Sequence, residues 1–312
     1  MAIGRVISLD SGVYKILGEN NEEILLKARG SLRHKEVSKD SSFNKSTNKY
    51  SKKVETKRIK LSPKVGDLVL YECSLDTYFL DDVLPRKNEL IRPDIANVDQ
   101  IMLIFSAKRP DLSYFLLDTF ISNLELHSIK PLIVITKIDL LSNEELTKLK
   151  EGMSYYNKIG YPVFYVNSKE GVPEEIKLYL KDKITVLSGQ TGAGKSTFIN
   201  ALIPGFKLET NDISDALNRG KHTTRRSHLY PYFGGLIGDT PGFSKLESFS
   251  SKDVLRDTFI EFKNYPCAFR DCLHIRGTKG CGVILEVGRE IKETRYNNYL
   301  KMLEGVGKKY DN

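Results

Sequence analysis

The sequence has no long hydrophobic run, no export signal and little cysteine. None of its apolar stretches approaches the ~20 residues that cross a bilayer, which excludes an integral membrane protein and predicts no membrane partner. The opening residues, MAIGRVISLDSG, lack a charged stretch followed by an apolar one, so we expect no secretory signal and a cytoplasmic location. Four cysteines are too few for a disulfide scaffold, and three of them crowd beside a histidine in 267–281, which favours a metal site.

The composition is that of a globular protein, with 40% hydrophobic and 28% charged residues. A length of 312 residues suggests two or three domains. The formal net charge is +8, and residues 33–60 alone hold ten Lys and Arg against three Asp and Glu. This stretch reads as a basic loop, which is either a solvated insertion or a contact for a phosphate backbone.

Residues 1–85 are expected to form an OB-type β-barrel with the basic insertion 33–60, although another small barrel would give the same pattern. The candidate strands are short, rich in Val, Ile, Leu and Tyr, and separated by Gly, Asn and Pro. They cover 5–10, 13–17, 23–29, 67–72 and 78–84. We expect Cys73, alone in this region, to be a packed thiol.

Residues 86–250 are expected to form an α/β domain, because near-continuous apolar strands alternate with helical segments. The helices are expected at 113–126 and 143–159, with Ser142 or Asn143 as the N-cap of the second. The strands are expected at 100–105, 132–135, 163–166, 184–188 and 236–238. This pattern predicts a mainly parallel sheet flanked by helices.

Residues 251–312 are expected to form a helical domain that binds zinc. A helical run is expected at 252–263 and a long amphipathic helix at 284–304. One face of the long helix is predicted to carry Ile284, Val287, Ile291, Tyr299, Met302 and Leu303. Between the helices, Cys267, Cys272, His274 and Cys281 offer three thiolates and one imidazole, a closed tetrahedral set for one structural Zn²⁺. The alternative is a cluster of buried cysteines beside a surface histidine.

Residues 189–196 match the phosphate-binding pattern G-x-x-x-x-G-K-[ST] between a predicted strand and a predicted helix. The glycines let backbone N–H groups close around phosphate oxygens, Lys195 supplies a charge, and the Ser196 hydroxyl binds Mg²⁺. A plain glycine turn is the alternative. The predicted contacts are Gly189, Gln190, Thr191, Gly192, Ala193, Gly194, Lys195, Ser196 and the following Thr197.

Two further segments complete a triphosphate site. Asp239 opens the sequence Asp-Thr-Pro-Gly after a predicted strand, as in the D-x-x-G element of GTPases, so Asp239 is expected to hold the Mg²⁺ and the Gly242 N–H to meet the γ-phosphate. Either Thr223 or Thr224, in GKHTT, is expected to complete the magnesium shell.

A guanine site is predicted from the segment Thr136, Lys137, Ile138 and Asp139, which resembles N-K-x-D with Thr in place of Asn. The Asp139 carboxylate can accept from N1–H and the exocyclic amine of guanine, a donor pair that adenine lacks. Asn167 and Ser168, in Asn-Ser-Lys at the next strand end, resemble the S-A-K element that supports the base. A surface aspartate after a strand is the alternative for Asp139.

The guanine motifs precede the phosphate loop, which reverses the usual GTPase order. Strand ends form the site, so a circular permutation leaves its chemistry intact. The permutation also puts the D-x-x-G loop a few residues before the Cys/His segment. We therefore expect loss of the γ-phosphate to move that loop and the C-terminal domain with it.

The whole chain resembles the circularly permuted GTPases called ribosome small-subunit-dependent GTPase A. The resemblance lies in LPRKNELIRPDIANVDQ at 84–100, GKHTT at 220–224, GDTPGF at 238–243 and the spacing at 267–281. It implies GTP hydrolysis to GDP and phosphate, stimulated by the small ribosomal subunit during its late maturation. It also implies that the barrel and the zinc domain contact ribosomal RNA. We expect a monomer.

A histidine is the predicted catalytic residue. Many GTPases place a Gln directly after D-x-x-G to orient the attacking water, but Phe243 stands there and cannot bond water. His222 is the nearest candidate in sequence, and the resemblance assigns a catalytic role to the histidine of G-x-H-T-T. The alternative is that His222 only packs its loop.

Two other functions remain possible from the residues alone. The first is a switch GTPase that acts on another RNA or on a protein. The second is a zinc-containing nucleic-acid-binding module with a vestigial nucleotide site, which the intact Lys195, Ser196 and Asp239 disfavour.

Overall fold

The computed structural model describes residues 1–10, 12–28, 35–38, 56–59, 62–90, 94–203, 227–239 and 248–307. Two compact units divide the chain. Unit 1 comprises Met1–Asp99, Leu180–Val186 and Arg219–Gly242, and unit 2 comprises Gln100–Tyr179, Leu187–Asn218 and Phe243–Asn312. No helix in the described part of the chain is long and apolar enough to cross a membrane.

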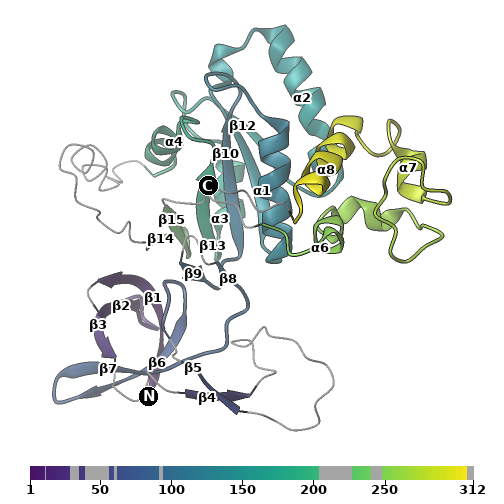
Figure 1. Cartoon of the computed structure of the whole chain (residues 1–312). Coiled ribbons are helices and arrows are strands. Elements are labelled where there is room, and N and C mark those ends of the chain that lie inside the picture. Colours follow the sequence, from purple (N-terminus) through teal and green to yellow (C-terminus); the bar gives the residue numbers. More distant parts are fainter. Residues whose placement is uncertain are drawn as a thin grey trace, which may run out of the picture. The chain divides into compact units, whose positions relative to one another are not determined.

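The predicted five-stranded barrel is confirmed in unit 1 (Figure 1). Each strand pairs with two others in the order β1, β2, β3, β7, β6 and back to β1, which closes the sheet. The β3–β7 pair is parallel and the other four pairs are antiparallel. The strands are β1 (Ala2–Asp10), β2 (Val13–Leu17), β3 (Glu23–Ala28), β6 (Leu68–Ser74) and β7 (Thr77–Val83).

Alternating residues of these strands fill the barrel, as the period of two in a strand requires. The fully buried side chains are Val6, Ile16, Leu26, Val69 and Leu80. The prediction for Cys73 is wrong, because this thiol is exposed. Cys73 lies near the end of β6, beside a tight turn in which Leu75 and Asp76 both have positive φ.

The basic insertion contains strands that its sequence did not predict. β4 (Lys35–Ser38) and β5 (Thr56–Ile59) form an antiparallel pair with Lys35 opposite Ile59. The remainder of 33–60 lies outside the described residues. Part of this segment is therefore a hairpin rather than a plain loop.

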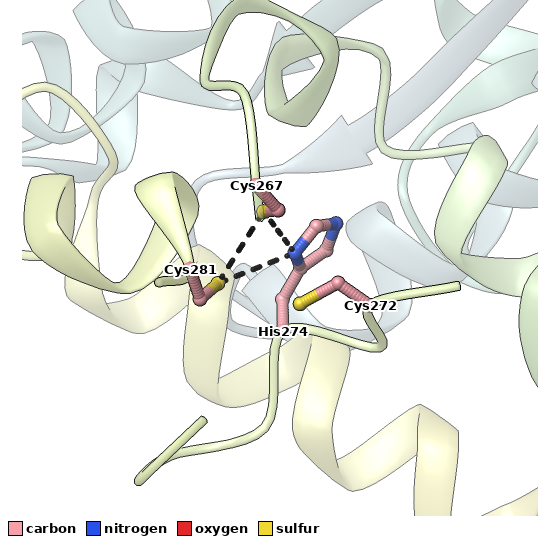
Figure 2. Close-up of side chains that lie close together, drawn as sticks. All are labelled: Cys267, Cys272, His274 and Cys281. Carbon is pink, nitrogen blue, oxygen red and sulfur yellow. Dashed lines mark hydrogen bonds between the residues drawn. The ribbon is translucent and has the colours of Figure 1, made fainter. Parts of the chain in front are cut away.

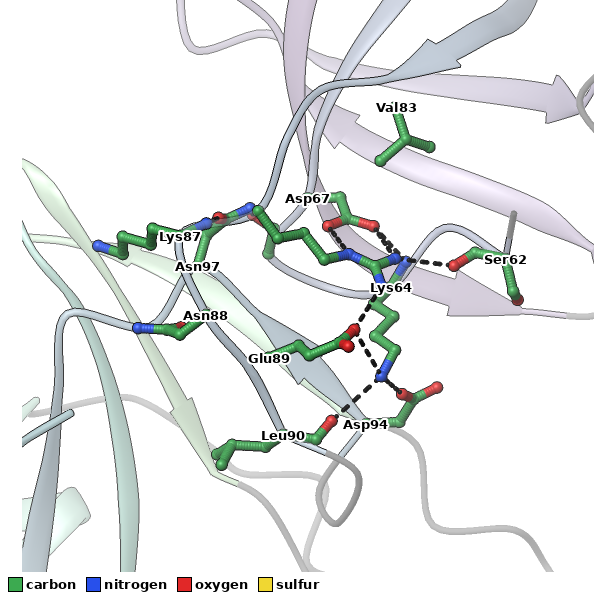
Figure 3. Close-up of polar contacts among 12 residues, drawn as sticks. Ser62, Lys64, Asp67, Val83, Lys87, Asn88, Glu89, Leu90, Asp94 and Asn97 are labelled. Carbon is green, nitrogen blue, oxygen red and sulfur yellow. Dashed lines mark hydrogen bonds and ion pairs between the residues drawn. The ribbon is translucent and has the colours of Figure 1, made fainter. Parts of the chain in front are cut away.

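A segment that follows the barrel is bonded back onto it (Figure 3). It contains β8 (Glu89–Leu90) and β9 (Ile95–Ala96). Arg86 makes two hydrogen bonds of 2.8 Å to Asp67, and Asn97 donates to the Gly66 carbonyl. Gly66 has a φ of +91°, and a Cβ there would lie 2.0 Å from the Ala96 oxygen, so only glycine allows this close approach.

Unit 2 contains the parallel strands expected of an α/β domain. β10 (Gln100–Ser106) pairs with β11 (Lys130–Thr136), which pairs with β12 (Val163–Val166), all parallel. Every residue of β10 is buried, in agreement with a sheet covered on both faces. β13 (Ile184–Gly189) begins in unit 1 and ends in unit 2.

Helices connect these strands (Figure 1). They are α1 (Tyr114–Leu126), α2 (Asn143–Lys158), α3 (Glu174–Leu180) and α4 (Lys195–Leu202). Ser142 is the N-cap of α2, which settles the choice between Ser142 and Asn143. Its hydroxyl accepts from the Glu145 N–H, and the Glu145 carboxylate accepts from the Ser142 N–H in return.

An antiparallel hairpin follows in unit 1, and only its second strand was predicted. β14 (His228–Tyr232) pairs with β15 (Gly235–Asp239) and also with β1, where His228 lies opposite Ser8. The sequence of β14, His-Leu-Tyr-Pro-Tyr, lacks a continuous apolar run. This explains why it gave no strand signal.

The C-terminal segment is helical, but the long helix predicted at 284–304 is wrong. Its place is taken by α7 (Gly282–Glu286) and α8 (Glu293–Gly305). Gly288, at a φ of +83°, turns the chain between them, and its N–H donates to the Ile291 carbonyl at 2.8 Å. Ile291 is nevertheless buried, so the apolar pattern correctly predicted that this residue is buried but wrongly predicted that it lies in a helix.

The helical run predicted at 252–263 is also divided, into α6 (Lys252–Asp257) and a short 3₁₀ helix, Ile260–Asn264. These elements and α8 enclose a common apolar core. Its largest buried members are Phe259, Phe262, Tyr296 and Tyr299.

Candidate nucleotide and metal sites

The phosphate loop has the strand–loop–helix form that its sequence predicts. β13 ends at Gly189 and α4 begins at Lys195. Gly189 has a φ of +134°, and a Cβ there would lie 2.0 Å from the Ile104 oxygen. Gly194, the N-cap residue of α4, is left-handed at φ 80°. The glycines are thus required by backbone conformation and close packing.

Lys195 holds its ammonium group against the loop. Its Nζ donates to the carbonyls of Gly189 at 3.3 Å and Gln190 at 3.0 Å. The N-terminus of α4 adds the positive end of a helix dipole at the same place. A polyphosphate is the ligand that this arrangement suits.

The predicted base motifs meet the phosphate loop at a cavity of about 290 Å³. Residues from β11, the segment after β12 and α4 that are far apart in sequence line it together, because carboxyl ends of parallel strands share one edge of a sheet. The predicted residues on its wall are Thr136, Lys137, Asp139, Asn167, Ser168, Gly194 and Thr197. Arg109, Leu140 and Lys169 complete the lining.

Thr136, which stands where N-K-x-D has Asn, connects the base motif to the phosphate loop. Its buried hydroxyl donates to the Ala193 carbonyl and also lies 3.2 Å from the Phe105 oxygen. Lys137 makes a second connection, since its Nζ donates to the Gly192 carbonyl at 2.7 Å. The two motifs therefore form one hydrogen-bonded structure.

Asp139 has a cationic partner at the cavity. Its Oδ2 accepts from Lys169 Nζ at 2.7 Å, and this hydrogen bond raises the pKa of Lys169. The Asn167 amide oxygen accepts from the Lys169 N–H at 3.2 Å, which fixes the loop that carries both residues. The Asp139 carboxylate is thus a hydrogen-bond acceptor on the cavity wall.

Several predicted residues are not placed. His222, Thr223, Thr224 and Gly242 lie outside the described residues. Asp239 is the last residue of β15, and its backbone alone is described. Ser196 lies in the first turn of α4, next to Lys195.

The four predicted metal ligands converge in unit 2 (Figure 2). Their ligand atoms all lie within 4.8 Å of one another. His274 Nδ1 lies 3.5 Å from Cys267 Sγ and 3.4 Å from Cys281 Sγ, and these two sulfurs are 3.7 Å apart. Three sulfurs and one imidazole nitrogen around a common centre suit tetrahedral Zn²⁺.

The surroundings favour the protonation states that ligation needs at His274 and Cys267, but not at Cys281. Burial lowers the pKa of His274 to about 4, which keeps its imidazole neutral. Burial alone would raise the pKa of Cys267, but N–H donors from Val283 and Gly282 lower it. Burial raises the pKa of the Cys281 thiol to about 12, so this thiol would depend on the metal for deprotonation.

Arg109 is a cavity residue that the sequence motifs missed, as is Leu140 directly after the base motif. Arg109 lies in the loop after β10, whose last residue, Ser106, is paired with Thr136. The rule that strand ends share one edge of the sheet could have found it.

Comparison with known proteins gives consistent matches. The family model described as RsgA GTPase matches residues 83–249. A "Small ribosomal subunit biogenesis GTPase RsgA" from Onion yellows phytoplasma is 41% identical, over 96% of each chain. A protein named "Small ribosomal subunit biogenesis GTPase RsgA 2" from Oceanobacillus iheyensis is 39% identical, over 98% of each chain.

Two solved structures are similar over nearly the whole chain. YjeQ from Thermotoga maritima has a TM-score of 0.80 and 33% identity, with 99% of each chain covered. YloQ, described as a circularly permuted GTPase, has a TM-score of 0.75 and 33% identity, with 98% of this chain and 95% of that chain covered.

Proposed function

Because this chain belongs to the RsgA GTPase family, it is a GTP hydrolase, and we propose that it acts on the small ribosomal subunit during late maturation. The observation that carries the proposal is the cavity at which Asp139 of the base motif and Gly194 of the phosphate loop lie together. The relatives named above are called small ribosomal subunit biogenesis GTPases, which supports this partner.

The cavity supports binding of a guanine base. The Asp139 carboxylate accepts from guanine N1–H and the exocyclic amine, and it exchanges its bond to Lys169 for this pair. ATP presents no such pair of donors, so it offers the carboxylate nothing in exchange for the bond to Lys169. Asn167 and Ser168 support the base from the neighbouring strand end.

The phosphate loop supports binding of the polyphosphate through its backbone N–H groups and Lys195. Ser196 and Asp239, with Thr223 or Thr224, are the residues proposed to hold Mg²⁺, and the Gly242 N–H is proposed to meet the γ-phosphate. Bound Mg²⁺ would neutralise charge on the transferred phosphoryl group.

His222 is proposed to orient the attacking water, because Phe243 cannot. The substitution His222→Ala is then expected to leave GTP binding unchanged and to remove most turnover, on the order of 10²-fold or more. The matched control is His127→Ala, at the C-cap of α1 and outside every predicted motif. Equal turnover in wild type and His222→Ala would refute the role.

We propose that the cysteine and histidine cluster holds one structural Zn²⁺. The four ligands leave no open position, so the metal would fold 267–281 and take no part in hydrolysis. Metal analysis of the purified protein should give one zinc per chain, and Cys272→Ser should lose it. Protein without bound zinc that melts at the same temperature would contradict this proposal.

The basic insertion 33–60 supports an electrostatic contact with ribosomal RNA. We propose an organisation in which the barrel (1–85) and the zinc-binding segment (251–312) hold the RNA, while 86–250 hydrolyses GTP. The chain is proposed to act as a monomer in the cytoplasm.

Steady-state hydrolysis of GTP and ATP, with and without purified small subunits and at two salt concentrations, tests the function. We expect the subunit to stimulate GTP hydrolysis alone, and we expect salt to weaken the stimulation. GTP turnover that is indifferent to the subunit would favour a switch GTPase with another partner. No turnover with either nucleotide would reject the proposed activity.

A further inference from the structure

The loop between β10 and α1 brings an arginine to the base cavity. Arg109 lies on the wall that also carries Thr136, Lys137 and Gly194, yet it belongs to none of the nucleotide-binding motifs of the sequence. Its position follows from the sheet, because β10 and β11 are parallel neighbours and Ser106 is paired with Thr136. The segments that follow these two residues therefore leave the sheet side by side.

The backbone at Arg109 is held by both nucleotide-binding loops. Lys137 Nζ donates to the Arg109 carbonyl as well as to Gly192, and the Gln190 amide donates to the Asp111 carbonyl at 3.2 Å. Arg109 has a φ of +57°, a conformation that residues with a Cβ rarely adopt. Such a conformation persists where its surroundings fix it, and at functional sites in particular.

The same loop packs against the phosphate loop. A Cβ built on Gly192 would lie 3.5 Å from Pro110 Cδ, so the residue after Arg109 is already close to the backbone that cradles phosphate. The Ser106 hydroxyl donates to the Pro110 carbonyl at 2.6 Å and so fixes the loop. The arginine side chain thus starts from a fixed point beside the phosphate loop.

The charge of Arg109 is available to a ligand, whereas neighbouring lysines are engaged. Lys137 and Lys195 each donate to two backbone carbonyls, and Lys169 pairs with Asp139. The Arg109 residue is exposed, and within the described ranges its guanidinium has no hydrogen-bond or ion-pair partner. A guanidinium keeps its charge at any physiological pH.

We propose that Arg109 binds the polyphosphate of the guanine nucleotide, as a second cation beside Lys195. This inference rests on the proposed nucleotide site. An arginine offers paired N–H donors that match phosphate oxygens, and such charge-assisted hydrogen bonds are stronger than neutral ones. Guanine itself presents no net charge for this side chain to neutralise. Arg109 is therefore assigned to the diphosphate rather than to the base.

The test compares nucleotide affinities of single-site variants by titration with fluorescent GDP and by competition with GDP and GMP. Arg109→Gln is expected to weaken GDP about tenfold, the effect of losing one charge-assisted contact, and to weaken GMP clearly less. Arg109→Lys keeps the charge and should retain most of the affinity for GDP. The affinity of the wild type should also fall more steeply with salt than that of Arg109→Gln.

Lys108→Gln is the matched control, because it removes the same charge one residue earlier. Lys108 pairs with Glu145 at 2.9 Å and does not line the cavity, so its loss should leave GDP affinity unchanged. A circular dichroism melt confirms that each variant folds.

The possible outcomes separate the two proposals. If the wild type binds GDP and Arg109→Gln binds it equally tightly, the assignment of Arg109 is overturned while the nucleotide site stands. Equal losses of GDP and GMP overturn it too, since the contact would then be with the nucleoside or its first phosphate. A wild type that binds no GDP, or prefers ATP, overturns the proposed nucleotide site itself.

Discussion

Two arginine-centred clusters, one in each unit, attach a chain segment to a core, and they differ mainly in burial. In unit 1, Arg86 bonds Asp67 and Glu89 and so fixes the segment that follows the barrel (Figure 3). In unit 2, Arg295 of α8 bonds Asp118 of α1 and Glu261 of the 3₁₀ helix. The Arg295 cluster is almost fully buried, whereas Glu89 is 37% exposed.

Burial makes the Arg295 cluster a tie between two helices. Burial raises the pKa of Asp118, but three donors meet its two oxygens, at 2.7 Å from Arg295, 2.7 Å from Tyr156 and 2.6 Å from Asn298. A buried charge without such partners is very unfavourable, so helices α1 and α8 are obliged to stay together. Any movement of the C-terminal helices with the nucleotide state would therefore have to carry α1 with them.

The largest effect is expected from Arg295→Met, which leaves Asp118 and Glu261 buried without their cation. Removing one partner of a buried pair destabilises by about 3–5 kcal/mol. Urea unfolding, followed by tyrosine fluorescence because the chain has no tryptophan, measures the loss. Arg276→Met is the control, since Arg276 and Glu293 are 60% and 61% exposed and such a pair contributes about 0–1 kcal/mol. Similar losses in both variants would contradict the importance of burial.

A smaller effect is expected from Arg86→Met. Asp67 is fully buried, but it keeps a hydrogen bond of 2.7 Å from the Lys64 N–H, and the Lys64 ammonium already pairs with Glu89. A loss of about 1–3 kcal/mol follows, less than for Arg295→Met. The same unfolding measurement applies, with Lys15→Met as the control for an exposed pair in the same barrel. A loss as large as that of Arg295→Met would reverse the order of the two clusters.

The sequence predicted which residues lie together at the two candidate sites much better than it predicted these two clusters. The phosphate loop, the base motifs and the metal ligands each consist of residues at short, fixed spacing. Such a pattern can be recognised in the sequence without knowledge of the fold. Arg295 and Asp118 are 177 residues apart, so no local pattern could pair them. Arg86 and Asp67 are closer in sequence, but at 19 residues apart they too lie beyond the reach of a local pattern.

The errors in the predicted fold have a common cause. The apolar pattern of 284–304 correctly predicted that Ile291 and Tyr299 are buried, but it could not detect the turn at Gly288. β14 was missed because its sequence has no continuous apolar run, and its pairing with β1 joins residues that lie far apart in the sequence. Burial is encoded locally, whereas pairing partners and turns depend on tertiary contacts.

Double-mutant cycles sharpen the comparison by isolating one arginine–glutamate pair in each cluster. The pair distances are similar, 2.8 Å for Arg295 and Glu261 and 2.6 Å for Arg86 and Glu89, so burial is the main difference. We expect a coupling free energy of about 1–3 kcal/mol for the buried pair and about 0.2–1 kcal/mol for the partly exposed one. The cycles use Met at each arginine and Gln at each glutamate. Equal coupling free energies would show that hydrogen-bond geometry, not burial, sets the strength.

The smallest change in stability is expected when acid protonates Glu89. Burial alone would raise the pKa of Glu89, but Lys64 and Arg86 together lower it below its ordinary value of 4.5. A lowered folded-state pKa gives stability that is present above the unfolded-state pKa and is lost as pH falls through the folded-state pKa.

At pH 7, Glu89→Gln should therefore be less stable than wild type by under about 1 kcal/mol, because the pair is partly exposed. This difference in stability should close below about pH 4. The contribution of Asp118 to the pH dependence of stability has the opposite sign. Because its pKa is raised in the folded state, the folded state takes up the proton first and gains stability as pH falls. Unfolding midpoints of wild type and Glu89→Gln from pH 7 to pH 3.5 measure the difference. A difference that persists unchanged at pH 3.5 would mean that the charge of Glu89 does not set its contribution to stability. The two clusters would then not differ in their response to acid in the way their burial implies.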